Sequence, residues 1–223
     1  GGRDPTKAAR PAAEIGAGAL GLSGDVRDYD AIRGVMETVA NQLGPMDIVI
    51  SGAAGNFLAP ALGMSANAFR TVVDIVLNGT FNVFRGCHDL LNRPGASLIA
   101  ITAGQAINAS ALQAHACAAK AGINQLIAAP GPEGGPEVPV NGIPPGPIAD
   151  TEGMTRLAPD AETRQAHYDR IAMKRWGKIS EVAESAVFLC SPAAGYITGT
   201  ILDCDGGSQI GDASRGDVAR GMA

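Results

Sequence analysis

Apolar residues occur along the chain in two alternating patterns, short continuous runs and longer stretches with helical spacing. The short runs, bounded by Gly, Pro or Asp, predict strands at 17–22, 46–50, 97–102, 138–143 and 200–204. The longer stretches predict helices at 28–43, 66–90, 111–128 and 180–190. Asp28 or Asp30 is a suitable N-cap for the first of these helices and Ser180 for the last, while Gly44-Pro45 ends the first.

Strands that alternate with helices in this order predict parallel strands joined by right-handed helical crossovers. The strand segments are apolar at successive positions, as strands covered by helices on both faces require. We therefore expect an α/β fold of the Rossmann type, a doubly wound parallel sheet in a three-layer α/β/α arrangement. With 223 residues the chain suits one such domain over 1–223, with an irregular tail at 209–223.

Small residues follow the predicted strands, at the edge of the sheet where such folds bind ligands. The segments are Gly24-Asp25-Val26, Gly52-Ala53-Ala54-Gly55, Thr102-Ala103-Gly104 and Pro145-Gly146-Pro147-Ile148. Each segment alone is typical of a tight turn. Together, at the strand ends of one sheet, they would let a flat ligand lie against the backbone, which indicates a nucleotide site.

Composition narrows the function classes. A net charge of −5 disfavours binding to nucleic acid or to an anionic membrane, and no apolar run approaches the roughly 18 residues of a membrane span. The four cysteines are isolated in apolar surroundings, which predicts free thiols in a reducing compartment and a cytoplasmic location. Three scattered histidines predict no metal site.

The order of these segments closely resembles the short-chain dehydrogenase/reductase family. Further matches are Ala118-Ala119-Lys120-Ala121-Gly122 and Tyr196-Ile197-Thr198-Gly199 before Asp205-Gly206-Gly207, so that the resemblance runs from Gly2 to about Ser208. Within the family the chain looks most like the 2,4-dienoyl-CoA reductase branch. That likeness rests on 53–57 (AAGNF), 79–83 (GTFNV), and 146–148 (GPI) with 151–153 (TEG).

The resemblance implies an NAD(P)-dependent enzyme and a set of site residues. Lys120 would bind the nicotinamide ribose hydroxyls and stabilise developing negative charge. Asp25 and the Val26 amide would contact the adenine, and Gly2-Arg3 with no acidic residue there favours NADP(H) over NAD(H). The remaining cofactor-binding residues would be Ala53, Ala54, Gly55, Thr102, Pro145, Gly146 and Ile148. A homodimer or homotetramer that binds an acyl-CoA or ketone substrate is the expected assembly.

The chain departs from the family at three places. The family's opening strand and Gly-rich phosphate loop, roughly thirty residues of a βαβ unit, are not in this sequence. The usual catalytic Tyr and Ser positions hold Ala116 and Ala103, and the position where the branch has Asn or Asp holds Val76. The sequence therefore assigns no proton donor, and water is one candidate. Residues 129–139, rich in Pro and Gly, predict that the preceding helix stops near Ala128.

Three functions follow from these residues. The leading hypothesis is NADPH-dependent reduction of a conjugated enoyl or 2,4-dienoyl-CoA thioester, because ordinary carbonyl reduction needs an acid that Ala116 cannot supply. The second is a carbonyl reductase, for 3-oxoacyl thioesters or ketones, with a displaced acid. The third is a catalytically silent nucleotide-binding protein. His115, next to Ala116, could reach the substrate, but we do not assign it as the acid.

Overall fold

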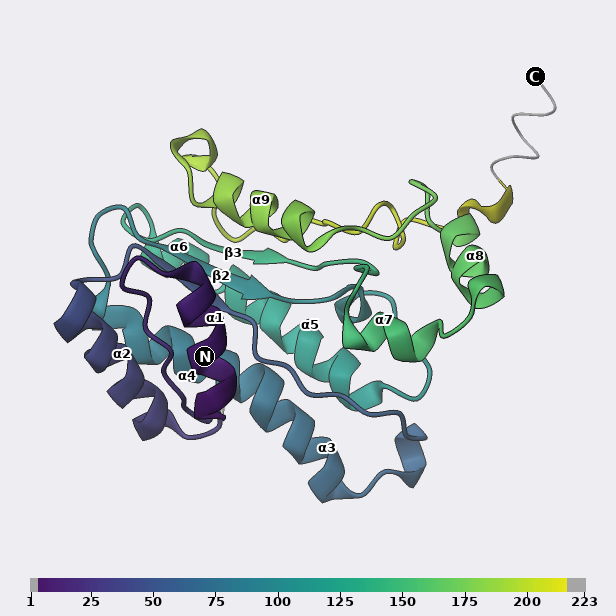
Figure 1. The fold of residues 1–223 in the computed structure, drawn as a ribbon, viewed down its shortest axis with the longest axis horizontal. Helices are drawn as coiled ribbons and strands as arrows, with labels where there is room; N and C mark the ends of the chain where they lie inside the picture. The colour runs from purple at the N-terminus through teal and green to yellow at the C-terminus, as the bar shows by residue number, and fades with distance from the viewer. Residues whose placement is uncertain (1–3, 216–223) are drawn as a thin grey trace.

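A parallel sheet lies between two layers of helices (Figure 1). The computed structural model describes residues 4–215, apart from the side chains of residues 152, 156 and 215. The sheet contains β1 (Ile48–Ser51), β2 (Ser97–Ile101) and β3 (Val140–Ile143) in the order β1-β2-β3. All pairs are parallel, with Ser51 opposite Ala100 and Ala100 opposite Gly142. The predicted α/β fold with helical layers on either side of a parallel sheet is confirmed.

The predicted last strand, 200–204, runs beside β3 without forming a continuous strand. Gly142 N donates to Thr200 O and Leu202 N donates to Gly142 O, both at 2.8 Å, and isolated parallel bridges join Gly142 to Ile201 and Pro145 to Cys204. The prediction of a regular strand was wrong because Pro144 has no N–H to donate, so that the ladder is interrupted there and resumes only where Gly146 N donates to Cys204 O.

The predicted strand at 17–22 is a turn and loop in the structure. Among the described residues, β1 pairs with β2 alone, and residues 20–26 lie across a groove of about 650 Å³ from its other edge. The groove is lined by apolar side chains that include Leu20, Leu22, Ile48 and Ile50. The prediction failed because a strand exists only where a neighbour supplies partners for its backbone N–H and C=O groups.

Helices cover the two faces of the sheet unequally. On one face lie α2 (Tyr29–Leu43), α3 (Ala66–Val73), α4 (Gly79–Cys87) and α5 (Ala114–Ala128), and on the other α9 (Ile179–Leu189). Since successive strand residues point to opposite faces, Leu98 joins the first core and Ile99 packs with α9. At β1, however, Ile48 and Ile50 are 52% and 49% exposed. The expectation of strands covered on both faces therefore holds for β2 and β3 and fails for β1.

The long predicted helix over 66–90 is one helical stretch with a widened turn. A π-helical segment, Asp74–Asn78, joins α3 to α4, and a short 3₁₀ helix, His88–Leu90, follows. Val76 lies in the widened turn and is 1% exposed. The remaining helices are α1 (Pro5–Ile15), α6 (Pro130–Gly134), α7 (Glu152–Leu157) and α8 (Ala161–Arg170), and 3₁₀ helices lie at Ala61–Gly63, Gly104–Ala106, Pro192–Ala194 and Ala213–Arg215.

Both predicted ends of α2 and the predicted C-terminus of α5 were right, whereas α5 begins at Ala114 instead of 111 and the predicted N-cap of α9 was wrong. Asp28 caps α2 by accepting a hydrogen bond from Ala31 N at 3.1 Å, and α5 stops at Ala128 before the short proline-led α6. The N-cap of α9 is Lys178 instead of Ser180. The carboxylate of Glu181 accepts from the backbone N–H of Lys178 at 2.7 Å, which starts the helix earlier than the Ser180 hydroxyl would.

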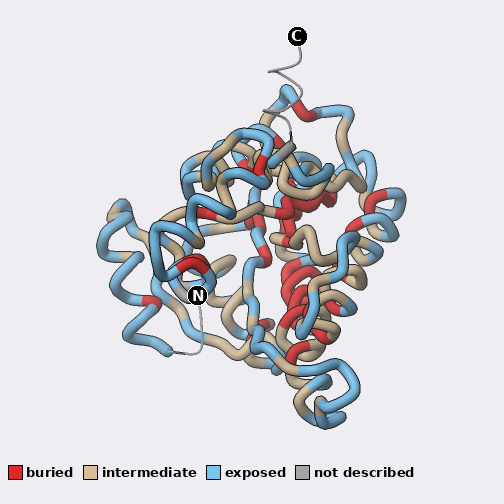
Figure 2. Tube along the Cα trace, turned by 90° about the vertical axis from the view of Figure 1, so that its right-hand side faces the viewer, coloured by how far each residue is buried: buried red, intermediate tan, exposed pale blue. Residues whose placement is uncertain are grey.

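We predict that Ile99→Ala lowers the free energy of unfolding by about 2–5 kcal/mol, because Ile99 is fully buried between the sheet and α9. Figure 2 shows that buried residues concentrate along the inner strands and helices. Urea denaturation measures the change. The matched control is Ile48→Ala on the exposed face of β1, for which we expect about 1 kcal/mol or less. Equal losses in the two variants would contradict the assignment of the second core to α9.

Candidate active site

Parallel pairing brings the segments that follow the strands to one edge of the sheet. Two adjoining cavities reach this edge. One is the groove of about 650 Å³ that runs along the unpaired side of β1, and the other is an apolar cavity of about 540 Å³. Ile50 lines both of them. The groove takes the predicted residues Val26 and Ala53, and the apolar cavity takes Pro145, Gly146 and Ile148. The structure therefore brings these five predicted residues into one continuous depression.

Other predicted residues lie beside these cavities without lining them. Ala54 and Gly55 follow Ala53 in the loop after β1. Thr102 is buried at the end of β2, and its hydroxyl donates to Oδ1 of Asn124 at 2.6 Å. Arg3 lies outside the described residues, so its predicted contact with a 2′-phosphate stays a prediction.

Asp25 and Val26 are held in place by neighbouring side chains. The Asp25 carboxylate accepts from the backbone N and the guanidinium of Arg27, and the Val26 carbonyl accepts from Nδ2 of Asn82 at 2.8 Å. Gly79 packs so closely that a Cβ there would lie 2.7 Å from Cγ2 of Val26. These contacts fix the 24–26 loop against α4 at one end of the groove.

Lys120 lies on α5 with its ammonium group at the end of β2. Its Nζ donates to the carbonyl oxygen of Ile101 at 2.7 Å. Burial lowers the pKa of Lys120 from 10.5 to about 8, because removal from water disfavours the charged form. A lysine with such a pKa is a common feature of functional sites, and the Ala-rich helix alone did not predict this burial.

The positions that carry proton donors in the family are apolar in the structure as well. Ala116 is 6% exposed, one turn before Lys120 on the same helix, and Val76 is packed in the core at the π turn. His115 is fully buried, with its ring centroid 4.4 Å from that of Phe57. Neither of its ring nitrogens has a hydrogen-bond partner among the described residues.

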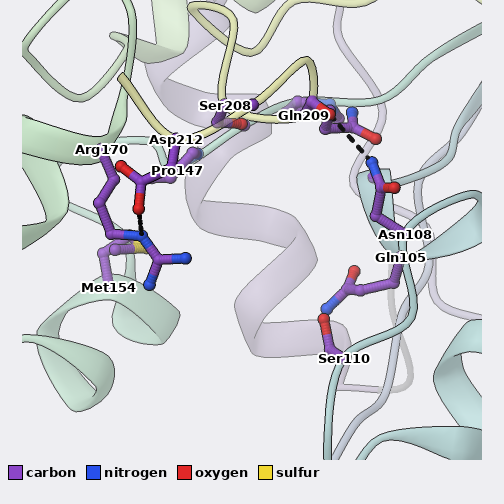
Figure 3. Close-up of a pocket in the computed structure, with 13 residues that line it drawn as sticks. Gln105, Asn108, Ser110, Pro147, Met154, Arg170, Ser208, Gln209 and Asp212 are labelled. Atoms are coloured by element: carbon purple, nitrogen blue, oxygen red, sulfur yellow. Dashed lines mark hydrogen bonds and ion pairs between the residues drawn. The ribbon is translucent and has the colours of Figure 1, made fainter. Parts of the chain in front are cut away.

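A polar cavity of about 450 Å³ continues the site and was not predicted from the sequence (Figure 3). It shares Pro145, Gly146 and Met154 with the apolar cavity. Its other walls come from segments far apart in the chain and include Gln105, Asn108, Ser110, Arg170, Ser208, Gln209 and Asp212. Nδ2 of Asn108 donates to the Gln209 carbonyl at 3.2 Å, which ties the loop after β2 to the segment after Asp205.

The turn at Gly146 needs a residue without a side chain. Gly146 N donates to Cys204 O at 3.0 Å, and a Cβ on Gly146 would lie 2.6 Å from the Cα atom of Asp205. Together with the small residues after β1, this close packing leaves a wall with little side-chain bulk at the edge of the sheet where such folds bind their ligands.

Within residues 4–215 no cluster of His, Cys, Asp and Glu could hold a metal ion. Over the same part of the chain, no helix is both long and apolar enough to cross a membrane. The cysteines that the structure describes are unpaired, and Cys87 is fully buried.

The fold and the strand-end cavities define an α/β domain of the Rossmann type with a candidate ligand site at the carboxyl ends of its strands. Residues 2–209 match a family model described as enoyl-(acyl carrier protein) reductase. The chain is 40% identical over 207 residues to the peroxisomal 2,4-dienoyl-CoA reductase of Pongo abelii, an alignment that covers 92% of this chain and 71% of that protein. It is 36% identical to the protein of the same name from Arabidopsis thaliana, over 86% of this chain and 68% of the other.

Solved structures of short-chain dehydrogenases have the same fold as this chain. A short-chain dehydrogenase from Bacillus anthracis superposes with a TM-score of 0.79 at 32% identity, over 93% of this chain and 83% of the other. A short-chain dehydrogenase/reductase from Brucella melitensis gives a TM-score of 0.83 at 25% identity, over 92% and 83%. The chain belongs to the short-chain dehydrogenase/reductase family, whose members are NAD(P)-dependent oxidoreductases, and its likeness to 2,4-dienoyl-CoA reductases is confirmed.

We predict that the burial of Lys120 appears as a pH dependence of stability. Between pH 8 and 10.5 the unfolded chain holds the Lys120 proton more than the folded chain does, so the free energy of unfolding rises with pH in this window. Relative to Lys120→Met, the unmodified chain should gain up to roughly 3 kcal/mol over the window. Urea denaturation from pH 7 to 10.5 measures the gain.

The matched control for this prediction is Lys7→Met, which removes an exposed lysine on α1. We expect the difference between that variant and the unmodified chain to stay flat with pH. A Lys120→Met curve that runs parallel to the curve of the unmodified chain would contradict the buried charge.

Proposed function

We propose that this protein reduces conjugated enoyl or 2,4-dienoyl-CoA thioesters with NADPH. The observation that carries the proposal is a half-buried Lys120, which donates to the carbonyl of Ile101, on a helix face where the tyrosine position holds the buried Ala116. Reduction of a ketone needs an acid at the nascent alkoxide, and Ala103, Ala116 and Val76 supply none. When a conjugated thioester is reduced, the negative charge develops on the thioester oxygen, several bonds from the carbon that accepts the hydride. The proton is then added to a carbon atom, so the reaction does not need a tyrosine to protonate an alkoxide.

The apolar cavity and the polar cavity would hold the nicotinamide and the thioester, respectively. A bound nicotinamide would supply the hydride. The apolar cavity would hold the nicotinamide ring against Ile101, Gly146 and Ile148 and exclude water from it. Lys120 would hold the ribose hydroxyls and place a positive charge near the carbon that accepts the hydride. The polar cavity, joined through Pro145 and Gly146, would take the thioester.

The preference for NADP(H) rests on the first residues of the chain. Arg3 stands in the sequence where the resemblance would put the residue that selects the cofactor, and Lys7 lies in the first half of α1. The nearby Asp4 carboxylate is engaged as the N-cap of α1 and accepts hydrogen bonds from the backbone N and the hydroxyl of Thr6. Arginine pairs with a 2′-phosphate, whereas an acidic residue at this point would bind the ribose 2′-hydroxyl of NAD(H).

A homodimer or homotetramer is our proposal for the assembled state. It is supported by half-exposed aromatic side chains on the outer helices, Phe69 on α3 at 40% and Phe81 on α4 at 50%. The free cysteines support a reducing compartment, and we propose the cytoplasm, although the curated relatives are named peroxisomal.

We predict that the intact protein oxidises NADPH when given a 2,4-dienoyl-CoA and leaves a 3-oxoacyl-CoA unreduced. Lys120→Ala should lower kcat/KM for the dienoyl substrate by roughly 100-fold or more, because it removes both a cofactor contact and a nearby positive charge. The decrease in NADPH absorbance measures both rates. Arg10→Ala, which removes an 85% exposed side chain on α1, is the control and should retain activity.

Two other results would refute the proposal. Oxidation with the 3-oxoacyl substrate alone would identify a carbonyl reductase with a displaced acid. Binding of NADPH with no oxidation by either substrate would identify a catalytically silent nucleotide-binding protein.

A further inference from the structure

Three carboxamide side chains from separate segments meet beside the polar cavity. Asn56 follows β1, Gln105 follows β2, and Gln113 stands directly before α5. Oε1 of Gln113 accepts hydrogen bonds from Nδ2 of Asn56 and, at 3.1 Å, from Nε2 of Gln105. A backbone bond from Ala59 N to Leu112 O, 2.9 Å long, holds the loop after β1 against the segment before α5. We call these three side chains the carboxamide cluster.

Gln105 is the member of the carboxamide cluster that lines the polar cavity. Figure 3 shows its side chain extending into that cavity. A primary amide has two N–H donors, and Gln105 gives one of them to Gln113. With the Gln105 nitrogen directed at Gln113, the second N–H of that nitrogen is left to donate to a ligand.

Gln113 belongs to the same face of α5 as Ala116 and Lys120, which follow it by three and seven residues. Lys120 lies about 10 Å further along the helix axis. Lys120 and the carboxamide cluster therefore stand at opposite ends of one face, with the small side chain of Ala116 between them. An extended conjugated substrate would have its reducible carbon near the Lys120 end and its thioester near the cluster.

We propose that Gln105 donates a hydrogen bond to the carbonyl oxygen of the substrate thioester, and that Gln113 is the positioning residue that orients the donor. The identity of the substrate rests on the proposed function. The thioester oxygen is an acceptor that gains negative charge as the conjugated system is reduced. A donor held in place before the reaction stabilises that charge without reorganisation, and the cluster supplies it where the family's tyrosine hydroxyl is absent.

The experiment compares binding of a 2,4-dienoyl-CoA with that of its thioether analogue, in which a CH₂ group replaces the carbonyl. We expect the unmodified chain, with NADP⁺ present, to bind the thioester about three- to ten-fold more tightly, the worth of one hydrogen bond. Gln105→Leu and Gln105→Glu remove the donor and should reduce this ratio to about one. Calorimetry measures the Kd values, and thermal melts verify that each variant is folded.

Variants of Gln113 distinguish a role in orienting Gln105 from a role in stabilising the fold. Gln113→Glu keeps an oxygen that accepts from Asn56 and Gln105, so the thioester preference should survive within about two-fold. Gln113→Leu leaves Gln105 without its acceptor and should lose most of the preference at an unchanged melting temperature. Gln125→Glu, an exposed position on the same helix, controls for the added charge and should behave like the unmodified chain.

A preference for the thioester that persists in both Gln105 variants would overturn the proposal. An unmodified chain that binds thioester and thioether equally, or binds neither, would overturn it as well. Failure of the proposed function looks different, because the unmodified chain would then prefer the thioester in a Gln105-dependent way without oxidising NADPH, and the assignment of Gln105 would stand.

Discussion

Everything at the site depends on the parallel pairing of β2 with a strand on each side. The register that sets Ser51 opposite Ala100, and Ala100 opposite Gly142, makes the three strands end at one edge. Residues separated by some ninety positions in sequence, such as Ala53 and Gly146, then line adjoining cavities. An antiparallel or shifted pairing would place these segments at different ends of the sheet, and no shared depression would form.

The buried charge of Lys120 sets the electrostatics of that edge. Its ammonium group is largely removed from bulk water, which explains why its pKa falls to about 8. A backbone carbonyl at the end of β2 accepts a hydrogen bond from it. Such a group is costly in a core and useful in a site, because a ribose hydroxyl or an enolate can replace the solvent that it has lost. Val76, Ala103 and Ala116 occupy positions where the family has polar catalytic residues. Of the polar residues of that motif, this chain retains Lys120.

The sheet is covered evenly on one face only. Helices α2, α4 and α5 bury the first face along all three strands, whereas α9 covers β2 and β3 and leaves Ile48 and Ile50 half-exposed on β1. The same uncovered edge explains why 17–22 forms no strand, since β1 and that segment do not meet across the groove. Apolar patterning predicts which residues are more stable when buried. It does not show whether another element packs against them.

The sequence by itself determined the alternation of strands and helices, an aspartate cap at position 28 or 30, the helix end near Ala128 and the small residues that follow each strand, because local sterics and periodicity govern these features. It also indicated the family and the importance of Lys120. Only the tertiary structure decided that 200–204 lies beside β3 without a regular ladder, that burial shifts Lys120, and that Asn56, Gln105 and Gln113 meet. These outcomes depend on which distant groups become neighbours, and distances of that kind are set by packing and carry no local signature in the chain.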